Sequence, residues 1–274
     1  MNPTTKHNPP PTTALNLLKG AWRLALGALF PPRCLGCDGF IPWPQAHQAP
    51  DTSGPERWFC PSCLPGLTPL AKACPQCAFP LHRALDWAPL EHCPRCATDP
   101  PPWERTLAVY NHLGPAREAL HRLKFGRQRQ VAVGLAHLMA PLLASALDNG
   151  GADARPDLIV PIPLGPARLK ARGFNQARLL AEGLGARLDL TWAQEGILTR
   201  PIQSQSQHRL GRQERLSQEK GGDLAFVAQR KGLEGRTVAL VDDVMTTGAT
   251  ARAATQAVEA VGGKVIWVWV WSRA

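Results

Sequence analysis

The chain contains no cysteine after Cys96, although eight of its 274 residues are cysteine. This absence excludes cysteine-based nucleophilic catalysis from the carboxyl-terminal part. Every cysteine instead belongs to a Cys-x-x-Cys pair, which we call a hook. The hooks are Cys34/Cys37, Cys60/Cys63, Cys74/Cys77 and Cys93/Cys96.

Long apolar runs are also missing near the start of the chain. The segment Leu15 to Phe30 is too short and too charged to span a membrane. Lys19 and Arg23 interrupt it and no small-residue cleavage site follows, so it does not resemble a cleavable leader. It could lie on a membrane surface. We expect instead a tail and a short amphipathic helix over residues 1–30, with the helix packed on the cysteine-rich part.

Two common nucleotide-binding motifs are absent. The chain has no Gly-Lys-Ser/Thr phosphate loop and no Gly-x-Gly-x-x-Gly turn. These absences argue against a P-loop nucleotidase and a dinucleotide-binding domain. A phosphorylated ligand would therefore need a different kind of loop.

The four hooks predict two closed structural zinc sites. Two hooks bring four thiolates around one tetrahedral Zn²⁺, which leaves no open coordination position for catalysis. The alternative is the disulfide framework of a secreted domain, which the missing leader argues against. We therefore expect a small double zinc-ribbon module over residues 31–102, a reducing compartment and a cytoplasmic location.

The partners of each hook stay open at this point. Sequential pairing joins the first hook to the second and the third to the fourth, whereas an interleaved cross-brace joins the first to the third and the second to the fourth. Sequential pairing is favoured because it closes shorter loops at a lower entropic cost.

The residues after Pro102 alternate between apolar strands and helices, which predicts an α/β domain with a mainly parallel sheet over residues 103–274. Trp267, Trp269 and Trp271 alternate along the last strand and so share one face. Such a face serves core packing or an interface more often than it stacks nucleic-acid bases. The expected strands are Leu107–Tyr110, Leu158–Ile162, Val238–Val241 and Val265–Trp271, and the expected helices are Ala116–Leu123, Val131–Leu147, Asn175–Leu188 and Ala249–Val261.

The most informative run extends from Val238 to Thr250. An apolar strand there delivers two adjacent carboxylates, Asp242 and Asp243, to the sheet edge where ligands bind. A Thr- and Gly-rich turn follows and opens a helix, so backbone N–H groups and the helix dipole face one anion. The acidic pair is suited to ribose hydroxyls, and the turn to a 5′-phosphate. The turn residues are Thr246, Thr247, Gly248, Ala249 and Thr250.

The alternative for this run is an acidic turn that only caps the following helix. One carboxylate near a helix start is ordinary capping and contributes about 1 kcal/mol. Two carboxylates followed by Thr-Thr-Gly-x-Thr are harder to explain in that way, so the ligand-binding interpretation is favoured.

The run matches the phosphoribosyl-diphosphate (PRPP) signature of type I phosphoribosyltransferases, and the chain from about residue 30 to 272 resembles the ComF (ComF/GntX-like) family of competence proteins. The segments Tyr110–Gly114, Leu120–Phe125, Val160–Gln176 and Arg200–Arg215 carry the rest of this resemblance. It implies a type I phosphoribosyltransferase-like parallel sheet with flanking helices, preceded by the zinc-ribbon module. It also implies PRPP and Mg²⁺ as ligands, with Asp242 and Asp243 as the catalytic pair.

The resemblance assigns further residues to PRPP. Leu164 lies in the turn expected to bind the diphosphate. The basic residues Arg168, Lys170 and Arg172 follow it, and the alternative for them is a solvated basic face. A polar loop would close over the ligand with Gln207, Arg212 and Arg215. Gly211 and Ser217 depart from the Ser and Asn that are common in the family, which weakens the roles given to that loop.

The net charge of +10 indicates an anionic partner. One hypothesis is a PRPP-binding protein that transfers or senses the phosphoribosyl group, for which the sequence indicates no acceptor. The other follows from the resemblance: a factor of natural transformation that binds single-stranded DNA or competence and recombination proteins, with a regulatory or inactive PRPP site. DNA binding should weaken steeply with salt, whereas PRPP binding should need Mg²⁺ and the acidic pair.

Overall fold

The computed structural model describes residues 32–42, 54–81, 92–201 and 225–274. The segment Leu15 to Phe30 lies outside these residues. So do Gln207, Arg212 and Arg215 of the polar loop. This loop lies between the two-residue strands β3 (Leu198–Thr199) and β4 (Val227–Ala228), which pair in antiparallel orientation.

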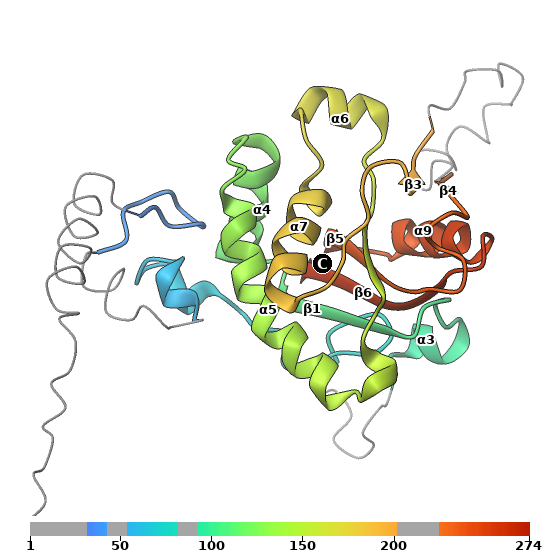
Figure 1. The fold of residues 1–274 in the computed structure, drawn as a ribbon. Helices are drawn as coiled ribbons and strands as arrows, with labels where there is room; N and C mark the ends of the chain where they lie inside the picture. Colours follow the sequence, from blue (N-terminus) through green and yellow to red (C-terminus); the bar gives the residue numbers. More distant parts are fainter. Residues whose placement is uncertain (1–31, 43–53, 82–91, 202–224) are drawn as a thin grey trace, which may run out of the picture.

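A four-stranded parallel sheet forms the centre of the described part (Figure 1). Its strand order is β1-β6-β5-β2, so the two strands nearest the carboxyl terminus lie in the middle. The predicted parallel sheet with flanking helices is thereby confirmed. The strands are β1 (Arg105–Asn111), β2 (Leu158–Pro161), β5 (Thr237–Met245) and β6 (Lys264–Arg273).

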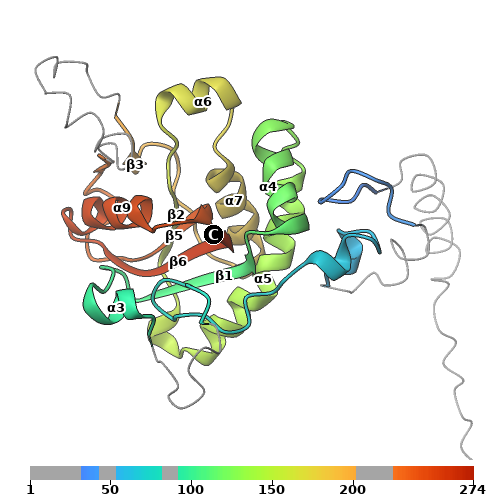
Figure 2. The ribbon, with the colours of Figure 1, turned by 180° about the vertical axis from the view of Figure 1, so that it is seen from behind.

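Helices cover both faces of the sheet (Figures 1 and 2). One face carries α4 (Gly114–Phe125), α5 (Val131–Asn149) and α7 (Gln176–Leu188). The other carries α9 (Ala249–Glu259). The short helix α6 (Pro166–Arg172) stands beyond the carboxyl end of β2 and was not predicted as a separate element.

The alternation of side chains along β5 and β6 divides the core into two layers. Trp267, Trp269 and Trp271 are buried in the layer under α4, α5 and α7. Val268 and Val270, which lie between them, are buried in the layer under α9. The tryptophans therefore pack the core, as the alternation indicated, and none of them offers a surface on which a base could stack.

Helix α5 has the length and apolar composition of a membrane span, and among the described helices it alone does. In this fold 56% of the apolar window is buried, and the helix packs with α4 and α7. Core packing therefore accounts for its composition.

The described residues of the cysteine-rich part pack against the α/β domain. Leu35 and Phe59, next to the first two hooks, are buried in the core layer formed by α4 and α5. The last hook lies at α3 (Pro94–Thr98), on the side of the molecule that carries α9 (Figures 1 and 2). The division of the chain at residue 102 stays a prediction.

Asn175 joins the carboxyl end of β2 to the start of α7. Its Oδ1 accepts a hydrogen bond from the Ala177 N–H at 3.1 Å, which caps the helix, and its Nδ2 donates to the Ile162 carbonyl at 3.0 Å. We expect Asn175→Ala to lower the free energy of unfolding by about 1–2 kcal/mol. Asn175→Asp keeps the capping oxygen and should cost less. Urea denaturation measures both, and equal losses would contradict the capping role.

Candidate functional site

A cavity of about 860 Å³ opens at the carboxyl ends of β2 and β5, and we call it the central cavity. This is the edge at which open α/β sheets bind ligands. Its lining joins the acidic pair to helices α4 and α6 and to the turn after β5. The titratable lining residues are His112, Arg117, His121, Lys124, Arg127, Arg168, Arg172, Arg200, Asp242 and Asp243.

The acidic pair lies at the base of this cavity, near the end of β5. Asp243 is 3% exposed, and its carboxylate forms an ion pair with the Lys124 ammonium. Gln176 Nε2 donates to Asp243 Oδ1 at 3.2 Å. The N–H of Asp243 donates to Asp242 Oδ1 at 2.8 Å. Helices α4 and α7 thus supply the partners of a carboxylate that β5 buries.

Burial alters the proton affinity of Asp242. It raises the pKa of Asp242 well above its usual range, and the adjacent charge of Asp243 raises it further. The Lys124 ammonium acts in the opposite direction. Burial also lowers the pKa of His112, whose Nδ1 lies 2.8 Å from the Ser272 hydroxyl, so the neutral imidazole is favoured.

Residues 246–250, which we call the phosphate loop, connect the acidic pair to α9. Gly248 has φ = 82°, a left-handed conformation that a side chain would strain, and α9 begins at the next residue. Thr246 and Thr250 line the central cavity. Thr247 and Gly248 line a second cavity of about 440 Å³ behind the loop, and Ala249 is exposed. The Ala249 N–H donates to Thr247 Oγ1 at 3.3 Å, and the other N–H groups in the first turn of a helix have no partner within the helix, which suits them to an anion.

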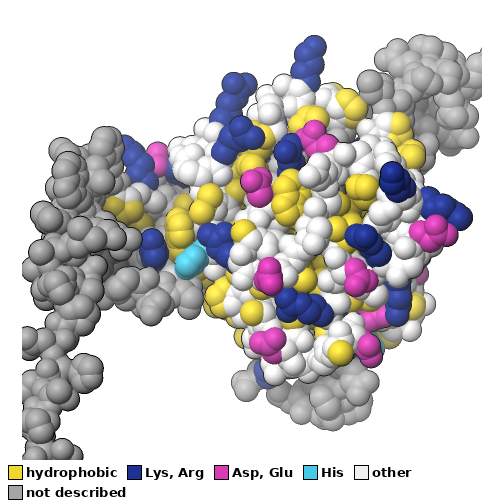
Figure 3. Space-filling model, viewed as in Figure 1, with side chains coloured by type: hydrophobic (Ala, Val, Ile, Leu, Met, Phe, Trp, Pro, Cys, Tyr) yellow, Lys and Arg dark blue, Asp and Glu magenta, His cyan; other side chains and the backbone are white. Residues whose placement is uncertain are grey.

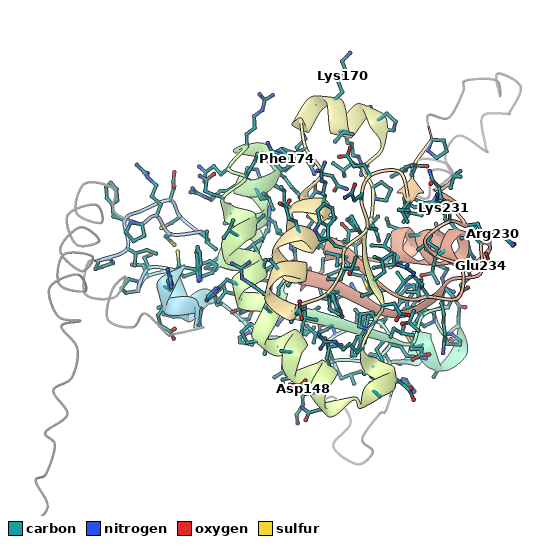
Figure 4. The ribbon with its side chains drawn as sticks, viewed as in Figure 1. Asp148, Lys170, Phe174, Arg230, Lys231 and Glu234 are labelled. Carbon is teal, nitrogen blue, oxygen red and sulfur yellow. The ribbon has the colours of Figure 1, made fainter. Side chains whose placement is uncertain are left out.

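The basic residues expected on the diphosphate divide into two groups. Arg168 and Arg172 line the central cavity together with Leu164, and Arg172 Nη1 donates to Gln176 Oε1 at 2.6 Å. Lys170 lies on the outer side of α6 and points away from the molecule (Figure 4). It is not among the lining residues.

Sequence reasoning missed most of the cationic lining. Lys124 and Arg117 come from α4, Arg127 follows that helix, and Arg200 follows β3. Lys and Arg side chains project from the surface around α4 and α6 (Figure 3). Lys124 lies within a segment that carried the family resemblance, and this was the available signal. Its ion pair with Asp243 spans more than a hundred residues of sequence and needs the fold to be seen.

Comparison with known proteins identifies relatives of this chain. It is 33% identical over 215 residues to the DNA utilization protein YhgH of Salmonella typhimurium, which covers 78% of this chain and 89% of the relative. It is 34% identical to the Escherichia coli protein of that name, over 73% of this chain and 83% of the relative. Competence protein F of Haemophilus influenzae is 29% identical over 67% and 79%. The chain belongs to the ComF family. No family model matches it.

Solved structures that match this ComF chain include an adenine phosphoribosyltransferase and an enzyme of purine biosynthesis. Adenine phosphoribosyltransferase from Thermoanaerobacter pseudethanolicus has a TM-score of 0.31 and 18% identity, over 57% of this chain and 86% of that protein. An allosteric regulatory enzyme of purine biosynthesis has a TM-score of 0.33 and 18% identity, over 51% of this chain and 26% of that protein.

The eight cysteines of this ComF chain form two groups of four. The first cysteine group is Cys34, Cys37, Cys60 and Cys63, and the second cysteine group is Cys74, Cys77, Cys93 and Cys96. This is the sequential arrangement and not the cross-brace. Within each group the sulfur atoms lie within 4.8 Å of one another.

The donor sets of both groups fit zinc. Sulfur atoms from different hooks lie 3.7 Å apart in the first group and 3.5 Å apart in the second. A tetrahedral Zn²⁺ with bonds of about 2.3 Å requires edges of roughly 3.8 Å. Backbone N–H groups of Cys60 and Gly39 point at the sulfurs of Cys34 and Cys37, at 3.3 and 3.4 Å, as they do around thiolates that ligate a metal.

The opening hooks of the two groups have the same backbone form. Asp38 and Ala78, each directly after its hook, have φ of 66° and 53°. Each donates its N–H to the first cysteine of the hook, Asp38 to the Cys34 carbonyl at 3.0 Å and Ala78 to the Cys74 carbonyl at 2.8 Å. The repetition supports one metal-binding design used twice.

We expect the purified chain to contain two zinc ions, because each group offers four thiol ligands. Replacing Cys37 and Cys63 with Ser should leave one ion, since only the first group loses donors. Plasma mass spectrometry of the metal with a parallel thiol titration checks this. A parent chain with all thiols freely reactive and no released metal would contradict it.

Asp242→Asn should stabilise the protein near neutral pH. The pKa of Asp242 is higher in the folded protein than in the unfolded chain. The protonated carboxyl therefore stabilises the fold in acid, below the pKa of an unfolded aspartate, and this stabilisation is lost as the pH rises through the pKa of the folded protein. Asparagine cannot ionise, so the variant avoids this loss. Urea denaturation over a pH series should show an advantage that disappears in acid. The exposed Asp148→Asn, at the far end of α5 (Figure 4), should show none.

Proposed function

We propose that this ComF protein binds PRPP together with Mg²⁺ in the central cavity, and that binding or transfer of the phosphoribosyl group serves the use of DNA taken up by the cell. The observation that carries the proposal is the position of the acidic pair. Two adjacent carboxylates lie at the base of a cavity whose lining also includes six Lys and Arg side chains. That arrangement suits a ligand with hydroxyl donors at its centre and anionic groups at its ends.

PRPP has this distribution of groups. Its ribose hydroxyls would donate to Asp242 and Asp243. Its 5′-phosphate would bind the phosphate loop, where the hydroxyls of Thr246 and Thr250 and the start of α9 offer donors. The volume of about 860 Å³ lies within the range of pockets that enclose ligands of this size.

The diphosphate would lie toward α4 and α6. Arg168 and Arg172 come from α6 and its end, and Arg200 lines the same cavity. Guanidinium groups bind phosphate oxygens through two parallel hydrogen bonds, so these side chains are suited to the leaving group of a phosphoribosyl transfer.

The acidic pair also has the chemistry to hold Mg²⁺. Magnesium takes oxygen ligands and is usually bound by one or two carboxylates together with substrate phosphates. When bound, it would neutralise the diphosphate. Asp243 is already compensated by Lys124, whereas Asp242 has no cation paired to it among the described residues. We therefore expect Asp242 to depend most on the ligand and its metal.

The biological role comes from the relatives, whose names refer to DNA utilization and competence. The family membership supports a role in the use of DNA. We place the PRPP site first because its geometry is specific, whereas a net charge of +10 would suit many anions. A reducing compartment is part of the proposal, because free thiolates are required at both zinc sites.

Calorimetric titration with PRPP, with and without Mg²⁺, tests the proposal. We expect saturable heat that requires the metal. Replacing both Asp242 and Asp243 with Asn should weaken binding by about a hundredfold or more, because two charged acceptors of hydroxyl groups are lost. Asp148→Asn serves as the matched control and should bind as the parent does.

The same titration with single-stranded oligonucleotide distinguishes the other hypothesis. DNA affinity that falls steeply with salt, in a chain that shows no heat with PRPP, would sink the PRPP proposal and favour a DNA-binding factor. Binding of both ligands, with only PRPP sensitive to the acidic pair, would keep it.

A further inference from the structure

The two cysteine groups lie in different surroundings. The first packs on helices: Trp58, near its second hook, lies 5.5 Å from the His137 ring on α5, and Asp38 forms an ion pair with Arg122 on α4. In the part of the chain that the structure describes, these contacts run to α5 and α4 and away from the phosphate loop. Its contacts are those of a structural support.

The second cysteine group, in contrast, contacts the phosphate loop directly. Arg95, inside the hook formed by Cys93 and Cys96, donates its Nη1 to the Thr247 carbonyl at 2.9 Å. A trans peptide directs its C=O and the following N–H to opposite sides. The Thr247 carbonyl held toward Arg95 thus turns the Gly248 N–H away from the cysteine group, as an anion cradle on the other side of the loop requires.

Met245, which precedes the phosphate loop, is linked to the hook of Cys74 and Cys77 through the side chain of Arg273. Arg273, which is 6% exposed, donates its Nε to the Cys77 carbonyl at 3.1 Å and its Nη1 to the Met245 carbonyl at 3.2 Å. Met245 directly precedes Thr246. One buried guanidinium therefore links the hook of Cys74 and Cys77 to the start of the phosphate loop.

Two further contacts reach Gly248 and α9. Trp103 donates its Nε1 to the Gln76 carbonyl, between Cys74 and Cys77, at 2.7 Å. The same indole lies 3.4 Å from the position that a Cβ would take at Gly248. Arg252, in the first turn of α9, pairs with Asp99 at 3.2 Å, just beyond α3. This last pair is largely exposed and contributes little alone.

We propose that the second cysteine group, when it holds zinc, clamps the phosphate loop in its anion-binding form, with Arg95 as the positioning residue. Arg95 belongs to one hook, while the anchors at Gln76 and Cys77 belong to the other. A metal bound by both hooks fixes these anchors relative to one another. PRPP affinity then depends on metal in the second group and not on metal in the first.

The inference rests on the proposed PRPP site and is tested first by Arg95→Ala. This variant keeps all cysteines, so both zinc ions should remain. We expect the dissociation constant for PRPP with Mg²⁺ to rise by about threefold to tenfold, because one charged hydrogen bond to the loop is lost. Arg95→Lys keeps a cationic donor and should restore part of the affinity.

Arg33→Ala is the matched control, because Arg33 stands beside the first cysteine group and pairs with Asp38. Its affinity for PRPP should equal that of the parent. Unchanged affinity in Arg95→Ala, or an equal loss in Arg33→Ala, would overturn the proposal. Thermal unfolding of each variant shows whether a loss comes from the loop or from general instability.

Removal of a single metal gives the second test. Cys96→Ser should weaken PRPP binding more than Cys37→Ser, with zinc content measured for each. Equal effects would show that zinc acts only through overall stability and would refute the clamp. Where a cysteine variant does not fold, the arginine variants decide.

Hydrogen exchange separates this inference from the proposed function. In Arg95→Ala the amides of residues 246–250 should exchange faster than in the parent without any ligand, and those of Arg33→Ala should not. Faster exchange in Arg95→Ala, in a protein that binds no PRPP, would support the role of the second cysteine group in holding the loop and reject PRPP as the ligand. Unchanged exchange would reject the clamp whatever the ligand.

Discussion

The arrangement of the central cavity depends on one buried charge. Asp243 is 3% exposed, and an isolated carboxylate in such a place would be too costly to keep ionised. The ammonium of Lys124 and the amide of Gln176 stabilise the charged carboxylate of Asp243. Their contacts require α4 and α7 to converge on the end of β5. Loss of one partner of a buried ion pair costs more than the pair contributes, so the three elements constrain one another. The geometry of the acidic pair is thus also a condition of folding.

For Asp242, in contrast, the surroundings disfavour the charged carboxylate. Burial and the neighbouring carboxylate both raise its pKa, and among the described residues no cation pairs with it. A group that the fold destabilises in its charged form is a natural position for a ligand that supplies the missing donors. Binding sites commonly carry such a cost in stability. The two carboxylates therefore differ although they are adjacent in sequence: Asp243 is held by an ion pair within the protein, whereas Asp242 has no paired cation among the described residues.

Periodicity and short motifs predicted the strands and helices of the α/β domain well, because a buried parallel strand has a continuous apolar run and each helix has its own apolar face. The sequential cysteine groups also followed from local reasoning, since loop closure favours near neighbours. Prediction failed where contacts join distant segments. Lys124 and Arg117 come from a helix more than a hundred residues before Asp243, and no local pattern links them to it. Lys170 belongs to the predicted basic cluster but lies on the outer side of α6, a helix that the sequence did not reveal as separate.

The placement of the cysteine groups bears on what zinc would do in this protein. A domain with a four-stranded sheet and helices on both faces has a core of its own, so metal is not required merely to bury apolar surface. The phosphate loop poses a different difficulty, because a turn rich in Thr and Gly has few apolar side chains to pin it and loses much conformational entropy on ordering. Arg95 and Arg273 supply polar anchors to its backbone from two hooks. Each anchor is only as rigid as the hook that carries it, and a shared metal ion joins both hooks with a binding energy far larger than that of any single hydrogen bond. The second cysteine group is therefore best understood as part of the loop's support, and the first as part of the core's edge.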